Sequence, residues 1–255
     1  MKAINLNPIM PVRTAPSEQS EQCTQLLFGE LFDVKVVNSK WCSIVNDSDG
    51  YEGFVSKNMV TFISEVDYKE LKDSQKILLS KPIAQVRDKG TNDTMFLPMG
   101  STLYNFVEGK FSIFDRDYEL IDTNVRAYSL NVLPEVALQL LNAPYLWGGK
   151  SVLGIDCSGF VQTVFAVCGK MLPRDASQQV AEGETICFLT EAKSGDLAFF
   201  ENEEGDIVHV GLLLDNRRIV HASGSVKISL MDNYGILSPD GGYSHKLRII
   251  KRIKC

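Results

Sequence analysis

The pattern of this 255-residue sequence changes near Asn131, and the change limits the folds that the chain can adopt. Before it, short β-rich runs alternate with clusters of turn residues, a pattern typical of small antiparallel barrels or sandwiches. After it, helical segments come first and strand-like runs follow, which indicates an α+β domain. The sequence therefore predicts separate folding units on the two sides of this point.

The first half contains two sets of β-rich runs. We expect the strands of the first set at residues 31–37, 41–45 and 51–55, and those of the second at residues 84–86, 95–97, 102–106 and 110–115. A polar segment, residues 65–75, separates the two sets. We therefore predict two small β modules, residues 1–66 and residues 67–128.

The second half, residues 129–255, is predicted to form a single α+β domain. Residues 134–142 carry apolar side chains at helical spacing behind an initial proline, and further helices are expected at residues 157–168 and 176–180. Strands are expected at residues 196–200, 208–214, 219–222, 226–230 and 247–253.

Charge and hydropathy exclude two classes of function. The net charge of −6 argues against a protein that mainly binds nucleic acid or coats an anionic membrane. No run approaches the roughly 20 apolar residues that span a bilayer, so no membrane insertion is expected. The first 13 residues lack the apolar core of a signal peptide, and the six cysteines form no CxxC pair. We expect a cytoplasmic location, or a periplasmic or extracellular one if an export segment has been removed.

Cys157 is the strongest candidate for chemistry. It falls where a glycine-containing loop meets the first turn of a predicted helix. The positive end of the helix dipole and unpaired N–H groups favour an anion there, so we expect a stabilised thiolate and a source of oxyanion donors. The alternative is a small buried hydrophobic residue.

Two of the three histidines, His209 and His221, lie in neighbouring predicted strands joined by an Asp215-Asn216 turn. A nucleophilic thiol needs a base, and the base needs a third group that fixes its tautomer. Two core histidines are the alternative. A zinc site is disfavoured because the ligands are far apart in sequence and no HExxH pattern accompanies them, so no metal or cofactor is expected. His245 follows a Gly-Gly pair and is expected to be a solvated loop residue.

At these residues and in the segments around them, the second half of the chain resembles the NlpC-type papain-like cysteine peptidases of bacteria. The resemblance rests on six segments in the same order: residues 144–149 (PYLWGG), 156–160 (DCSGF), 172–175 (LPRD), 194–197 (SGDL), 209–211 (HVG) and 221–223 (HAS). It implies an α+β papain-like catalytic domain.

The first half resembles the bacterial SH3-like modules of one branch of these enzymes, the gamma-D-glutamyl-L-diamino-acid endopeptidases. The relevant segments are residues 11–13 (PVR), 21–30 (EQCTQLLFGE) and 49–54 (DGYEGF), with Trp41. The resemblance implies two small SH3-like β-barrels before the catalytic domain. It also implies cleavage between γ-linked D-glutamate and a diamino acid, usually meso-diaminopimelate, in cell-wall (murein) peptides with a free N-terminal L-alanine.

The resemblance also implies roles for individual residues. Cys157 would be the nucleophile, His209 the base and His221 the residue that orients His209. The substrate would be bound by Tyr145, Trp147, Asp156, Ser158 and Asp175, with Glu21 and Tyr51 capping its amino group, although Glu30 or Glu52 could supply that carboxylate instead. The family often has serine after the aspartate at 175, and Ala176 stands here, so one polar contact is missing or replaced.

The sequence leaves other functions open. A non-catalytic wall-binding protein would use only the SH3-like modules, and an acyl- or amide-transferring enzyme would use the same thiol with an amine acceptor. We expect the intact cysteine and histidine set to belong to a hydrolase that acts on murein peptides during recycling. We also expect a monomer that binds no nucleic acid.

Overall fold

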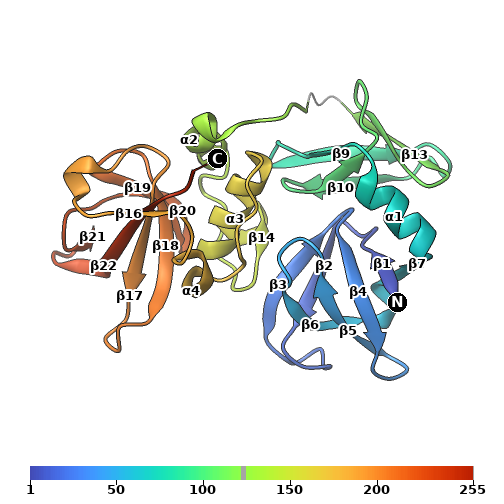
Figure 1. Ribbon diagram of the computed structural model, residues 1–255, viewed down its shortest axis with the longest axis horizontal. Coiled ribbons are helices and arrows are strands. Elements are labelled where there is room, and N and C mark those ends of the chain that lie inside the picture. The colour runs from blue at the N-terminus through green and yellow to red at the C-terminus, as the bar shows by residue number, and fades with distance from the viewer. Residues whose placement is uncertain (122–124, 255) are drawn as a thin grey trace. The chain divides into compact units, whose positions relative to one another are not determined.

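The computed structural model describes residues 1–121 and 125–254, which divide into two compact units, Met1–Ala127 and Tyr128–Cys255 (Figure 1). Each unit has its own sheets and its own buried core. No helix among the described residues is both long enough and apolar enough to cross a membrane.

Unit 1 begins with a seven-stranded antiparallel sheet. Its strand order is β3 (Gln22–Leu27), β2 (Ile9–Arg13), β6 (Glu52–Ser56), β5 (Trp41–Asn46), β4 (Leu31–Val36), β1 (Lys2–Ile4) and β7 (Thr61–Ile63). Alternate residues of β2 and β4 are buried, and they meet in a core that contains Met10, Val12 and Phe32. The three strands predicted at residues 31–55 are confirmed as β4, β5 and β6.

A second, smaller set of strands follows in the same unit. A four-stranded sheet has the order β10 (Thr94–Pro98), β9 (Ile83–Asp88), β13 (Arg116–Ile121) and β12 (Lys110–Ile113), and β11 (Thr102–Tyr104) pairs with β8 (Lys76–Leu78). Among the described residues, none of the sheets of unit 1 closes on itself, since the terminal strands of each are unpaired with one another. The two predicted closed barrels are therefore open sheets with SH3-type strands.

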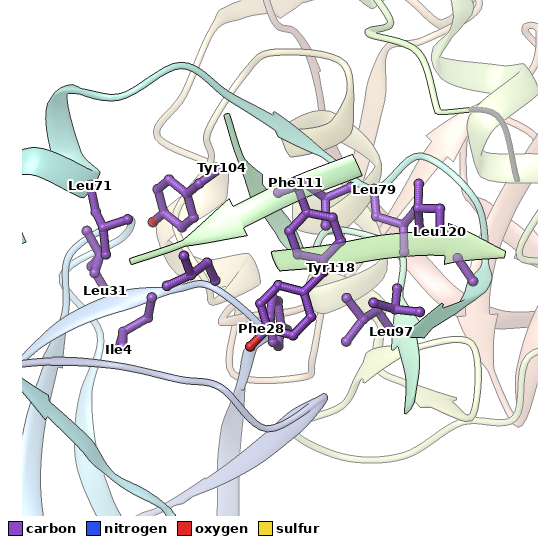
Figure 2. Close-up of a cluster of buried hydrophobic side chains, with 14 of the residues drawn as sticks. Ile4, Phe28, Leu31, Leu71, Leu79, Leu97, Tyr104, Phe111, Tyr118 and Leu120 are labelled. Carbon is purple, nitrogen blue, oxygen red and sulfur yellow. The ribbon is translucent and has the colours of Figure 1, made fainter. Parts of the chain in front are cut away.

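The two sets of strands share one hydrophobic core (Figure 2). Phe28, which follows β3, packs edge-on against Phe111 and Tyr118, whose rings stack at 4.9 Å. The hydroxyl of Tyr104 donates to the carbonyl of Gly29 at 2.8 Å. Gly29 has φ +82°, and a Cβ there would lie 2.4 Å from the Thr102 carbonyl, so this close approach requires glycine.

A helix, α1 (Glu65–Asp73), lies where the sequence indicated only a polar segment. Ser64 caps it by accepting from the Asp67 N–H, and Tyr68 and Leu71 are buried in the shared core. The predicted boundary between residues 66 and 67 falls inside this helix, and its buried face ties the two sets of strands into one unit.

Unit 2 has a seven-stranded antiparallel sheet. Its order is β16 (Glu184–Ile186), β22 (Tyr243–Arg252), β17 (Leu197–Glu201), β18 (Ile207–Leu213), β19 (Arg218–Ser223) and β20 (Ser225–Leu230), with β21 (Gly235–Leu237) also paired to β22. The helices are α2 (Leu133–Leu138), α3 (Cys157–Val167) and α4 (Ala176–Gln179), and β14 (Lys150–Ser151) pairs with β15 (Gly154–Ile155). The predicted α+β class is confirmed.

Helix α3 is almost entirely buried and packs against β18 and β19 of the sheet. Apolar side chains on several faces, among them Phe160, Val164 and Phe165, explain why a helix forms here and why it cannot lie at the surface. The first residue of this buried helix is therefore held rigidly against the central strands.

Candidate active site

The start of α3 is fixed by the carboxylate of Asp156. One oxygen accepts from the backbone N–H of Gly159 at 2.7 Å, and the other accepts from the N–H of Gly148 at 2.8 Å. This caps the helix and ties it to the preceding glycine loop. Cys157 follows directly as the first helical residue, so its position is set by the capping geometry.

Arg174 completes this anchor from the other side. Its two terminal nitrogens reach the two oxygens of Asp156 at 3.0 Å and 2.6 Å, and Nη1 also donates to the Ser158 hydroxyl at 2.8 Å. The Arg174 side chain is 1% exposed. Asp156 and Ser158 are both buried and bound to Arg174, because a buried guanidinium needs these oxygens. Their predicted contact with the substrate stays a prediction.

The thiol of Cys157 is 6% exposed and lies against the backbone of Val210 in β18, the residue after His209. Burial and the nearby charge of Asp156 raise the pKa of Cys157 to about 11, while hydrogen bonds from the Val210 and Ser158 backbone oppose the rise. The burial of this thiol works against the expected resting thiolate, which stays a prediction. Desolvation disfavours the charged form that the helix dipole favours.

His209 and His221 form a direct contact on the sheet. Nε2 of His209 lies 2.8 Å from Nδ1 of His221, and Nε2 of His221 lies 3.0 Å from the hydroxyl of Ser229. Both histidines are buried. Burial holds the pKa of His209 well below 6.5 and lowers the pKa of His221 to about 3, so both rings are neutral at pH 7.

Ser229 is a site residue that the sequence reasoning missed. In the hairpin of β19 and β20, Ser223 pairs with Ser225 around Gly224, and His221 pairs with Lys227. Side chains two residues apart share a face, so Ser229 follows Lys227 on the face of His221. Counting the register outward from this tight turn is the signal that could have found it.

His245 lies in β22 and not in a solvated loop, which corrects the sequence-based expectation. Its ring stacks on His209 with centroids 4.1 Å apart and an interplanar angle of 30°. The strand begins at Tyr243, directly after the Gly241-Gly242 turn, so His245 is already part of the sheet. The structure thus brings all three histidines together.

Two of the remaining predicted residues precede Cys157 in the glycine loop. Tyr145 is half-buried, and burial together with the charges of Cys157 and Asp156 raises its pKa to about 12, which shows that its phenol lies near the thiol. Trp147 is 59% exposed. Tyr145 therefore lies beside the thiol, and the predicted contact of Trp147 with the substrate stays a prediction.

The other predicted substrate-binding residues are Asp175 in unit 2 and Glu21 and Tyr51 in unit 1. Asp175 is the N-cap residue of the short helix α4, and its backbone N–H donates to Gln178. Glu21 and Tyr51 belong to unit 1, where Glu21 is exposed and Tyr51 lines a surface hollow with Glu52 and Phe54. Their predicted roles in substrate binding stay predictions.

The buried histidines should make the stability of unit 2 depend on pH. The unfolded chain takes up a proton on each ring near pH 6.5, whereas the folded rings stay neutral. Their stabilising contribution is therefore complete above pH 6.5 and is lost progressively as the pH falls toward about 3. We expect the free energy of unfolding to drop by up to about 1.4 kcal/mol per pH unit for each histidine between pH 6.5 and 5.

Urea denaturation at several pH values in this window measures the slope. His221→Asn serves as the matched control, because it removes one of the titrating rings and should make the slope shallower. A free energy of unfolding that is constant between pH 6.5 and 5 would contradict the neutral, buried state of the two rings.

Models of two known protein families match parts of this sequence. A family model described as the NlpC/P60 family matches residues 142–242, and one described as the bacterial dipeptidyl-peptidase Sh3 domain matches residues 12–59. The first range includes Cys157, His209 and His221, and the second includes Glu21 and Tyr51.

Relatives and a solved structure match over most of the chain. A gamma-D-glutamyl-L-lysine dipeptidyl-peptidase of Bacillus subtilis is 29% identical over 217 residues, covering 78% of this chain and 71% of the relative. Dipeptidyl-peptidase 6 of Lysinibacillus sphaericus is 26% identical over 253 residues, covering 88% of each. The crystal structure of an NlpC/P60 family protein from Bacillus cereus has a TM-score of 0.85 at 18% identity and covers 99% of both chains, which shows a shared fold.

Proposed function

We propose that this chain, an NlpC/P60 family cysteine peptidase with a bacterial dipeptidyl-peptidase SH3 domain, hydrolyses peptidoglycan peptides at the bond between γ-linked D-glutamate and the following diamino acid. The observation that carries the proposal is the chain of hydrogen-bonding contacts from His209 through His221 to Ser229 on the sheet, with the thiol of Cys157 on α3 against the backbone of Val210, the residue after His209. The names of the two curated relatives described above support the choice of a dipeptidyl-peptidase, and one of them specifies the γ-D-glutamyl-L-lysine bond.

The hydrogen bonds among the histidines assign the proton positions. His209 can accept the thiol proton on Nδ1 only if its own proton is on Nε2, where it donates to Nδ1 of His221. His221 then carries its proton on Nε2 and donates to the Ser229 hydroxyl. Ser229 thereby fixes the tautomer of His221, and His221 fixes that of His209.

Catalysis then proceeds by acyl transfer through the thiol. As the sulfur of Cys157 attacks the γ-carbonyl carbon of D-glutamate, its proton moves to Nδ1 of His209, and the carbonyl oxygen becomes an oxyanion. When the intermediate collapses, the C–N bond breaks and His209 returns the proton to the leaving amine of the diamino acid. Water then attacks the thioester, again with His209 as base, and releases the dipeptide and the free thiol.

Two groups near the thiol are suited to stabilise the oxyanion. The backbone N–H of Ser158, in the first turn of α3, lies within hydrogen-bond reach of the Cys157 sulfur. The phenol of Tyr145, with its pKa raised to about 12, stays protonated and can donate a hydrogen bond. We assign the oxyanion site to these donors.

We further assign recognition of the substrate amine to Glu21 and Tyr51 in unit 1. A free ammonium group in a partly desolvated site needs a carboxylate and favours an aromatic face. Such a cap would accept peptides with a free L-alanine and reject intact wall, in which that amine is acylated. Trp147, which is largely exposed, is suited to form a wall of the substrate site.

Mass spectrometry of products tests the proposal. L-Ala-γ-D-Glu-L-Lys, its meso-diaminopimelate counterpart, their N-acetylated forms and intact sacculi are each incubated with the protein. We expect L-Ala-D-Glu and the free diamino acid from the unblocked tripeptides and at least about tenfold slower cleavage of the acetylated ones. Cleavage at the L-Ala–D-Glu bond, or equal rates for the blocked and free peptides, would contradict it.

A further inference from the structure

His245 has no part in the mechanism above, yet its ring is in face-to-face contact with the base. The centroids of His245 and His209 are 4.1 Å apart. The ring of His221 meets the ring of His245 edge-on, with centroids 5.7 Å apart. The ring centroid of Phe200 on β17 lies 5.9 Å from that of His245 and 5.7 Å from that of His209. A ring in this position restricts the orientations that the base can adopt.

The backbone of β22 holds His245 in this place. His245 pairs with Ile236 of β21, and a Cβ at the neighbouring Gly235 would lie 1.9 Å from the His245 carbonyl oxygen. Glycine at 235 therefore allows β21 to approach the backbone of β22 closely at His245. The hydroxyl of Ser244 lies 3.0 Å from Nδ1 of His245, which further limits its rotation.

We propose that His245 is a positioning residue for His209 and sets the lower pH limit of activity. The inference rests on the proposed role of His209 as the base. While neutral, the stacked ring of His245 holds the imidazole of His209 in the orientation that accepts the thiol proton. Once protonated, it places a positive charge against a ring that must itself become positive when Cys157 reacts.

The other charges around His245 do not offset this effect. His209 on β18 and His221 on β19 are neutral, and Lys227 on β20 is positive. On β22 itself, Lys246 and Arg248 are positive and share the carboxylate of Glu201 on β17. An added proton on His245 thus meets a surrounding that is already positive.

His245 is the first of the three rings to take up a proton as the pH falls. It is partly exposed, whereas His209 and His221 are 6% and 1% exposed, so its desolvation is the smallest. Burial and Lys227 lower its pKa from 6.5, which places its protonation on the acidic side of neutrality. The decline of activity below pH 6.5 should therefore report His245 before it reports His209.

Two substitutions of His245 distinguish the effect of ring stacking from the effect of the positive charge. His245→Phe keeps an aromatic ring against His209 and cannot be protonated, and His245→Ala removes both. For His245→Phe we expect kcat/KM near pH 7.5 within about threefold of the parent and an acid limb displaced downward by about one pH unit. For His245→Ala we expect kcat to fall about tenfold at all pH values, with KM changed less than kcat.

A second readout does not depend on the peptide substrate. The rate at which iodoacetamide alkylates Cys157, followed by peptide mass mapping over the same pH range, reports proton transfer from the thiol to His209. The same downward displacement is expected for His245→Phe. Lys251→Gln is the matched control, since it removes a charge near the other end of β22, far along the strand from the stack, and its profile should match the parent.

An acid limb of His245→Phe identical to that of the parent in both readouts would overturn the charge effect. Full kcat in a folded His245→Ala protein would overturn the positioning role. If no protein cleaves γ-D-glutamyl peptides but the alkylation profiles shift as expected, the proposed function fails while the role of His245 stands.

Discussion

Replacing Cys157 with alanine is expected to lower kcat for the γ-D-glutamyl tripeptide on the order of 10⁴- to 10⁶-fold. The substitution removes the atom that forms the thioester, and the remaining oxyanion donors and His209 cannot replace it. Alanine is smaller than cysteine and fits the same buried position, so KM should change by less than about threefold and the fold should persist. Initial rates by product chromatography measure the effect.

Cys187→Ala is the matched control for this substitution. Cys187 is an exposed cysteine of the same unit, so its removal tests whether the loss of any thiol is harmful. Its rate should equal that of the parent. Parental activity in folded Cys157→Ala would remove Cys157 from the mechanism.

The second large effect is on stability, at the ion pair behind the nucleophile. Replacing Arg174 with methionine should destabilise unit 2 by about 3–5 kcal/mol, because it leaves the carboxylate of Asp156 buried with no opposite charge. The neutral variant Asp156→Asn, combined with Arg174→Met, should recover at least about 1 kcal/mol, since no unpaired charge then remains.

Urea denaturation can follow unit 2 separately from unit 1. The chain has two tryptophans, Trp41 in unit 1 and Trp147 in unit 2, so a Trp41→Phe background leaves only Trp147 to report. A midpoint for Arg174→Met within error of the parent would show that the pair contributes no net stability. A double variant no more stable than Arg174→Met alone would show that unpaired charge is not the cause.

The parts of the fold that the sequence could predict are those with a strong local pattern. The apolar faces of α3 and of strands β17 to β20 follow a helical or an alternating period, and the predicted ranges agree with the observed ones within a few residues. Strands β1, β2 and β3 and helix α1 were missed. They are short or polar, and they are stabilised by tertiary packing: Ile4, Tyr68 and Leu71 lie in the shared core of unit 1, and Met10, Val12 and Leu26 lie in the core of its first sheet.

The sequence could predict which residues form the candidate site but not the pKa of the Cys157 thiol. Cys157, His209 and His221 could be selected because each has a reactive side chain at an element whose position the pattern indicates. The raised pKa of the thiol depends on burial, which no local sequence reports. Ser229 and His245 depend on strand register, and the position of Asp156 depends on Arg174, 18 residues away in the chain.

Stoichiometric labelling of Cys157 tests the account most directly. The protein is treated with increasing iodoacetamide, and the labelled fraction of each cysteine and the remaining tripeptide hydrolysis are measured on the same samples. The account predicts that activity falls in direct proportion to the unlabelled fraction of Cys157 and is independent of labelling at Cys187. Undiminished hydrolysis by protein in which Cys157 is fully labelled would contradict it.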